Sequence, residues 1–196
     1  MRQTILRNLQ DIQSVLNRVI ESEALQSTLG DVATRCIDAL RGGNKILLAG
    51  NGGSAADAQH IAGELVSRFA FDRPGLPAVA LTTDTSVLTA IGNDYGYAQL
   101  FARQVEALGQ RGDVLIAYST SGNSENIVRG LQVARERGLR TVGLTGAGSH
   151  RMDPFCDHLL AVPAELTPRI QEVHLMLGHM LCGLIEQAMF GAGRGG

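Results

Sequence analysis

Five short apolar runs, separated mostly by segments of helix length, constrain the fold of this chain more than any other feature. The runs are KILLAG at 45–50, AVALTT at 78–83, DVLIAYS at 113–119, RTVGLTG at 140–146 and HLLAVP at 158–163. Apolar runs that alternate with helices are typical of parallel strands buried on both faces. The pattern predicts an α/β fold in which helices cover both faces of a five-stranded parallel sheet.

Amphipathic or apolar helices flank this core. Apolar residues recur at helical spacing over 3–22 and 24–40, so we interpret residues 1–42 as a helical hairpin. A last helix, from about Thr167 to Met189, is apolar nearly all round and needs more cover than one subunit supplies. These helices predict a homo-oligomer, with the hairpin serving oligomerisation. We expect the tail at 191–196 to be disordered.

Composition argues against several classes of partner. The chain of 196 residues carries a net charge of −2 and only 4% aromatic residues, with no basic stripe for nucleic acid. Its three cysteines, Cys36, Cys156 and Cys182, are widely spaced and fit reduced core thiols. The polar N-terminus and the lack of an apolar run of ~18 residues argue against a signal peptide and a membrane span. We expect a cytoplasmic protein of one main domain.

A glycine-rich loop, AGNGGSAAD, follows the first apolar run. Glycines at 50, 52 and 53 let the backbone approach a ligand, Ser54 can cap the next helix, and that helix N-terminus favours an anion. The spacing also fits the relaxed dinucleotide pattern GxGxxA, which requires an acidic residue ~20 positions later, at the end of the second strand. Asp72 lies at that distance from the glycines but precedes the second strand. Asp84 follows the end of that strand but lies about 30 positions after the glycines. A dinucleotide site is therefore disfavoured.

A second loop, YSTSGNSEN, follows the third apolar run. It offers the hydroxyls of Ser119, Thr120, Ser121 and Ser124, and it has no adjacent Lys or Arg. Neutral donors of this kind suit one terminal phosphate, whereas a triphosphate loop would show GxxxxGK[ST]; a serine-rich turn with an N-cap is the alternative. Both loops end parallel strands at the edge where such sheets bind ligands, which predicts a phosphorylated small molecule.

His60 and Glu64 lie four residues apart on the helix after the glycine loop. They project about 40° from each other, opposite an apolar arc. The arc consists of Ile61, Ala62, Leu65, Val66 and Phe69. The pair therefore points away from the core, either as a solvated pair or as part of a site that another subunit closes.

The last helix offers complementary ligands. Gln171 and His179 are two turns apart along one side, His174 projects the other way, and helix geometry does not choose between the two histidines. Two imidazoles, a carboxylate and an amide oxygen form a plausible ligand set for Zn²⁺, although amide ligands are uncommon.

Four motifs together carry a family resemblance. GNGGSAADAQHIAGEL, LPAVALTTDTSVLTAIGNDYGY, GDVLIAYSTSGNSENI and RIQEVHLMLGH, in this order, resemble a sugar isomerase (SIS) domain of the phosphoheptose isomerase family. The resemblance extends from about Lys45 to Phe190 and implies a SIS domain at 43–190 with a three-layer, flavodoxin-like doubly wound sheet. It further implies a homotetramer with active sites at subunit interfaces and one Zn²⁺ per subunit. Such enzymes convert sedoheptulose 7-phosphate into D-glycero-D-manno-heptose 7-phosphate, the first step toward nucleotide-activated heptose for lipopolysaccharide or capsule.

The resemblance also implies residue roles. It assigns the metal to His60, Glu64, Gln171 and His179, and proton transfer through a cis-enediol to Glu64 as base and His179 as acid. It assigns substrate contacts to Asn51, Gly52, Gly53, Glu64, Asn93, Asp94, Ser119, Thr120, Ser121, Ser124 and Gln171. One departure is visible after LTG, where the chain reads AGSHRMD in place of an Arg/Asp/Gly-rich turn. We expect this departure to affect loop shape and not chemistry.

Three alternatives share the SIS fold. A non-catalytic relative binds a replication initiator, but such proteins are altered at the His/Glu helix, and QHIAGEL keeps both groups. A phosphosugar sensor would be fused to a DNA-binding domain, for which this sequence has no segment. An isomerase of another sugar phosphate is not excluded by spacing.

Overall fold

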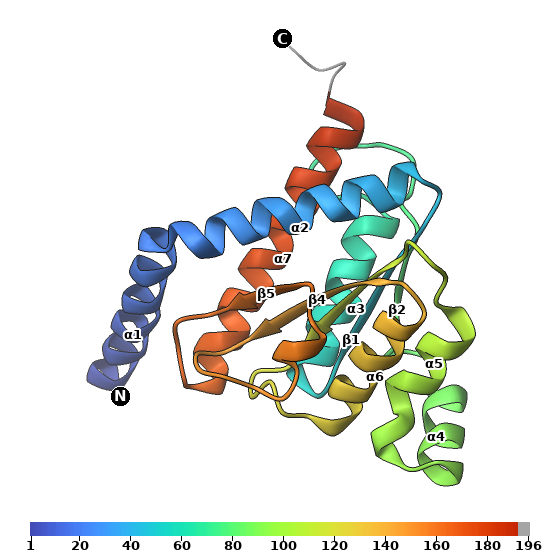
Figure 1. Ribbon diagram of the computed structural model, residues 1–196. Coiled ribbons are helices and arrows are strands. Elements are labelled where there is room, and N and C mark those ends of the chain that lie inside the picture. Colours follow the sequence, from blue (N-terminus) through green and yellow to red (C-terminus); the bar gives the residue numbers. More distant parts are fainter. Residues whose placement is uncertain (192–196) are drawn as a thin grey trace.

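The computed structural model describes residues 1–191, which fold around one parallel sheet (Figure 1). Its strands are β1 (Ile46–Gly50), β2 (Ala78–Ala80), β3 (Val114–Tyr118), β4 (Arg140–Thr145) and β5 (His158–Ala161), in the order β2-β1-β3-β4-β5. Each neighbouring pair is parallel, with Ile46 opposite Val114 in the central pair. β1 and β3 are buried at every position, as their continuous apolar runs predict. The predicted fold class and all five strands are confirmed.

Helices cover both faces of this sheet. They are α1 (Arg2–Glu21), α2 (Glu23–Arg41), α3 (Gly53–Val66), α4 (Thr85–Asp94), α5 (Leu100–Leu108), α6 (Glu125–Glu136) and α7 (Thr167–Phe190). Short 3₁₀ turns occur at Tyr97–Gln99 and Asp153–Phe155. On one face, Ile46 and Leu48 of β1 join the core formed with α2, α3 and α7. On the other face, Leu47 and Ala49 join the core formed with α5 and α6, so alternate strand residues serve opposite layers.

The two N-terminal helices are present as predicted, but they diverge at a wide angle instead of lying side by side (Figure 1). Ser22 alone joins them, and its hydroxyl caps α2 by accepting a hydrogen bond from the N–H of Leu25. Exposed apolar side chains therefore remain along α1, namely Ile5, Leu6, Leu9 and Ile20. The boundary at residue 42 and the role in oligomerisation stay predictions.

α7 is the long apolar helix that the sequence predicts. By length and composition alone it could cross a membrane, contrary to our expectation that no segment would. Ile170, Val173 and Leu177, however, pack in the core shared with α2 and α3, as expected of an internal helix of a globular domain. Met180 and Leu184 stay 46% exposed, which leaves an apolar surface without cover. The tail predicted to be disordered at 191–196 lies, apart from Gly191, outside the described residues.

The three cysteines are free, as predicted, with Cys36 and Cys182 buried and Cys156 half-buried. Burial raises the pKa of the Cys36 thiol to about 12, so this thiol stays protonated and unreactive in the core.

Candidate active site

The loops after β1 and β3 meet at the carboxyl edge of the sheet, beside the point where the strand order reverses. Asn51 of the glycine loop and Asn126 of α6 form a reciprocal amide pair, with two N–H···O distances of 2.9 Å. The hydroxyl of Tyr97 donates to the same Asn51 oxygen at 2.8 Å. The sequence analysis missed Asn126 and Tyr97. The sequence could have indicated Asn126, because this residue lies two positions after Ser124, at the start of a helix that faces the glycine loop.

The glycine loop turns sharply into α3. Gly52 has φ +57° and occupies the N-cap position, and no side chain caps this helix. The prediction that Ser54 caps α3 is wrong. Ser54 lies inside the first turn and is 3% exposed, because it packs back against Gly50, where a Cβ atom would collide with it. The positive φ of Gly52 lets the helix begin earlier than the hydroxyl residue suggested.

The serine loop gathers its hydroxyls around one turn. Ser119 is buried and donates to the Ser124 hydroxyl at 3.3 Å, while the Ser121 hydroxyl accepts from the N–H of Asn123 at 3.2 Å. α6 begins directly after Ser124, which places the N-terminus of a helix at this loop. Hydroxyls and a helix N-terminus together suit a phosphate group.

The segment at 147–153, which the sequence analysis interpreted as a departure from the family pattern, packs directly on the serine loop. The ring of His150 lies against Gly122, which has φ +61° and no room for a Cβ atom. The Met152 N–H donates to the Gly122 carbonyl at 3.0 Å, and the Arg151 side chain pairs with Glu125 at 2.6 Å. Residues 150–152 therefore shape a loop that we expect to touch substrate, a connection that the sequence analysis missed because the two segments are far apart in the chain.

His60, Glu64 and His179 come together where α3 crosses α7. The Nε2 atoms of His60 and His179 lie 2.8 Å apart, and His60 Nε2 lies 3.3 Å from Glu64 Oε1. Candidate ligand atoms of all three residues lie within 4.8 Å of one another. Two imidazole nitrogens at this distance must share a proton or a cation, and the N/O donor set suits Zn²⁺. The residues present therefore fit a metal ion.

Close packing of the two helices produces this cluster. A Cβ atom at Gly178 would lie 2.6 Å from Ile61 Cδ1, so only glycine lets α7 approach α3 beside His179. Phe69, beyond the end of α3, places its ring 5.7 Å from the ring of His179. An open cavity of about 460 Å³ is lined by residues of α3 and the segment after it, including His60, Glu64, Arg68 and Phe69.

The predicted apolar arc of α3 is mostly correct. Ile61, Ala62 and Leu65 are buried against the sheet, and the half-exposed imidazole of His60 points the other way. Val66 and Phe69 are exceptions. Val66 is 52% exposed because α3 ends at this residue, and Phe69 lies beyond the helix with its half-buried ring beside His179.

The two candidate histidines of α7 have different surroundings. His174 is fully buried, its Nε2 atom lies 3.2 Å from the carbonyl oxygen of Thr145, and its ring meets that of Tyr118 edge-on. Burial lowers the pKa of His174 to about 4, so this histidine is neutral. His179, which helix geometry alone could not distinguish from His174, faces the His60/Glu64 pair.

Besides the residues of the two loops, three further predicted site residues lie apart from this cluster within one chain. The Gln171 amide rests on Gly53, where a Cβ atom would be 2.7 Å from Gln171 Nε2. Gly53 and His60 are separated by about 10 Å along α3, so Gln171 reaches the glycine loop and not the His60 cluster. Asn93 donates to Asp94 at 2.7 Å at the end of α4, and Asp94 lines a separate cavity of about 550 Å³ between β2, α4 and α5.

Comparisons with known proteins identify the family of this chain. The SIS domain family matches residues 8–146. The chain is 59% identical to phosphoheptose isomerase of Burkholderia pseudomallei (strain 1710b) over 95% of each protein, and 55% identical to that of Aneurinibacillus thermoaerophilus over 97% of this chain and 96% of that one. A solved phosphoheptose isomerase from Neisseria gonorrhoeae superposes with a TM-score of 0.89 at 40% identity, over 95% of this chain and 98% of that one. The chain belongs to the SIS domain family and, within it, to the phosphoheptose isomerases.

Proposed function

We propose that this protein is the aldose–ketose isomerase that converts sedoheptulose 7-phosphate into D-glycero-D-manno-heptose 7-phosphate. This is the first step of nucleotide-activated heptose biosynthesis for lipopolysaccharide or capsule. The observation that carries the proposal is 59% identity, over nearly the whole chain, to a protein named for this activity. The intact His60/Glu64/His179 cluster supports a catalytic role over a non-catalytic one, since a purely binding relative does not need it.

We assign Zn²⁺ to this cluster. His60, Glu64 and His179 supply two imidazoles and a carboxylate, which leaves a further coordination position. Because Gln171 lies at the glycine loop of its own chain, its predicted ligation requires a second copy of the protein that brings its Gln171 to the cluster. When bound, the metal polarises the carbonyl and hydroxyl oxygens of the opened sugar.

The protein's own groups move the protons. Isomerisation transfers a proton between C1 and C2 through a cis-enediol, which needs a base at carbon and an acid at oxygen. Glu64 is the base: Oε1 faces His60 Nε2 at 3.3 Å, so the second carboxylate oxygen is the one that takes the proton. His179 is the acid, and because its Nε2 faces the cluster, Nδ1 is the nitrogen that exchanges a proton with substrate oxygen.

The serine loop anchors the phosphate with neutral donors, and the glycine loop holds the sugar close to the start of α3. Within one chain the glycine loop lies about two turns of α3 from the His60 cluster. A homotetramer with active sites between subunits would join the parts, and the exposed apolar residues of α1 and α7 offer surfaces for it. We further propose that this enzyme works in the cytoplasm.

A substrate panel tests the proposal. Heptulose, hexose and pentose phosphates are assayed side by side, each with and without a chelator, and size-exclusion chromatography with light scattering gives the oligomeric state. We expect turnover with sedoheptulose 7-phosphate that the chelator abolishes. Greater turnover of a hexose or pentose phosphate would reassign the substrate, and turnover of none would reject the enzyme.

A further inference from the structure

A buried ion pair links the two helices that carry the proposed metal ligands. Arg73 Nε lies 3.1 Å from Glu186 Oε1, and the two side chains are only 2% and 1% exposed. Glu186 also accepts hydrogen bonds from the N–H groups of Phe69 at 2.8 Å and Ala70 at 2.7 Å. Burial alone would raise the pKa of Glu186, but these N–H groups and Arg73 outweigh it and lower the pKa. Glu186 is therefore a charged group with every oxygen occupied.

Arg73 also forms hydrogen bonds to the end of α3. Its guanidinium donates to the carbonyls of Leu65 at 2.6 Å and Glu64 at 2.9 Å. These carbonyls belong to the last turn of α3, where helices lack internal donors and where a cation is favourable. Arg73 is thus attached to the backbone of the proposed base itself.

Glu186 is part of α7, the helix that carries His179. It lies on α7 seven residues, or about two turns, after His179, on the same side of the helix. Between them, the ring of Phe69 lies 5.7 Å from the His179 ring and close to Gly183, where a Cβ atom would be 3.4 Å from Phe69 Cε1. The hydrogen bonds of Glu186 to residues 69 and 70 therefore fix Phe69 beside the imidazole of His179.

We propose that Arg73 and Glu186 are positioning residues that set the separation of α3 and α7, and through it the geometry of the His60/Glu64/His179 donor set. Stability alone does not account for this pair, because apolar residues of similar volume often replace a buried ion pair without loss. Its hydrogen bonds end on α3, on α7 and on the segment that carries Phe69. The inference rests on the proposed metal site.

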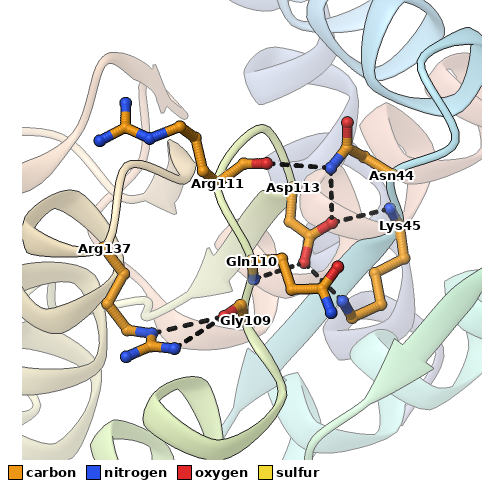
Figure 2. Close-up of polar contacts among 7 residues, drawn as sticks. All are labelled: Asn44, Lys45, Gly109, Gln110, Arg111, Asp113 and Arg137. Carbon is orange, nitrogen blue, oxygen red and sulfur yellow. Dashed lines mark hydrogen bonds and ion pairs between the residues drawn. The ribbon is translucent and has the colours of Figure 1, made fainter.

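The test measures metal affinity apart from activity. Full-length Glu186→Gln, Arg73→Lys and the double variant Arg73→Met/Glu186→Met are titrated with Zn²⁺ against a chromophoric chelator, and kcat, KM and thermal unfolding are recorded. The double variant keeps an apolar contact where single variants could fail to fold. The matched control is Asp113→Asn, which weakens the ion pair of buried Asp113 with Lys45; the hydrogen bonds of the Asp113 carboxylate go to residues 44, 45 and 110 and not to α3 or α7 (Figure 2).

We expect each pair variant to bind Zn²⁺ about 10- to 100-fold more weakly and to lose kcat with little change in KM, as when groups that orient metal ligands are removed. Asp113→Asn should lower thermal stability and leave Zn²⁺ affinity unchanged. Wild-type affinity in the pair variants, or a wild-type protein that binds no Zn²⁺, would overturn the inference. The two proposals can also fail separately. If the wild-type protein isomerises no heptose phosphate but the pair variants still bind Zn²⁺ more weakly than it does, the inference is supported and the proposed function is rejected.

Discussion

Two polar clusters of the molecule use similar residues for opposite purposes. At the amino edge of the sheet, Asp113 is fully buried and accepts from the Lys45 ammonium at 2.6 Å and from the N–H groups of Lys45 and Gln110 (Figure 2). Along α3, His60 is half-exposed and faces another imidazole. Charged groups that are fully partnered stabilise a fold, whereas groups with unused bonding capacity can bind a ligand.

The pKa values follow the same division. Burial raises the pKa of Asp113, but hydrogen bonds from Lys45, Gln110 and Asn44 outweigh it, so its pKa is lowered and the carboxylate is charged. Burial raises the pKa of Asp57, one turn before His60, and the nearby imidazole offsets this only in part. The Oδ2 atom of Asp57 has no hydrogen-bond partner among the described residues. Incomplete pairing therefore extends along α3 toward the cluster.

The largest expected effect is a loss of turnover in variants of the two proposed proton-transfer residues, without a loss of stability. Glu64→Gln and His179→Gln should each reduce turnover by at least about 10³-fold, since each removes a proton-transfer group. Both residues are partly exposed, so the free energy of unfolding should change by less than about 0.5 kcal/mol. Steady-state kinetics and urea unfolding measure the two quantities. Wild-type turnover in either variant would show that the proposed roles are wrong.

The reverse outcome is expected at the amino edge. Asp113→Ala should lower the free energy of unfolding by about 3 to 4 kcal/mol, because it leaves Lys45 without its partner and two backbone N–H groups without an acceptor. The kcat of the folded fraction should stay at the wild-type value. Loss of activity without loss of stability would contradict the division between the Asp113 cluster and the His60 cluster.

The sheet was predictable because continuous apolar runs have few alternatives to a buried parallel strand. The two phosphate-type loops followed from the topology, since parallel strands end at one edge. Contacts between distant segments were not predictable: Asn126 meets Asn51, and His150 meets Gly122, across many residues of chain. Local patterns also do not fix where a helix starts and ends.

The histidines of α7 illustrate the limit within one helix. Spacing places His174 and His179 on different sides, but only packing shows that His174 meets Tyr118 and Thr145 in the core. The same limit applies to Gln171, whose helical position agreed with a metal ligand but whose amide rests on Gly53. A projection gives the angle between side chains and does not say which neighbour each one meets.

The buried histidine supplies a pH test. Its pKa is about 4 in the folded chain against 6.5 ordinarily, so between these values the unfolded chain binds more protons and stability rises with pH. The contribution, roughly 3 kcal/mol in full, is present above pH 6.5 and is lost as pH falls toward 4. His174→Leu should flatten this part of the profile in urea unfolding. Other groups act on both proteins alike, so equal slopes would rule out His174 as the source.

The smallest expected effect is a change in KM on loss of the Tyr97 hydroxyl, which contacts Asn51 of the glycine loop. Tyr97→Phe removes the hydroxyl that donates to Asn51 and leaves the Asn51–Asn126 pair in place. One exposed hydrogen bond contributes about 0.5 to 1 kcal/mol, so KM for the sugar phosphate should rise about two- to fivefold at nearly constant kcat. Tyr95→Phe is the matched control, because Tyr95 is also exposed and its ring contacts Arg103, away from the loop. An equal rise in KM for both variants would indicate a general surface effect, whereas a rise for Tyr97→Phe alone would place the glycine loop in substrate binding.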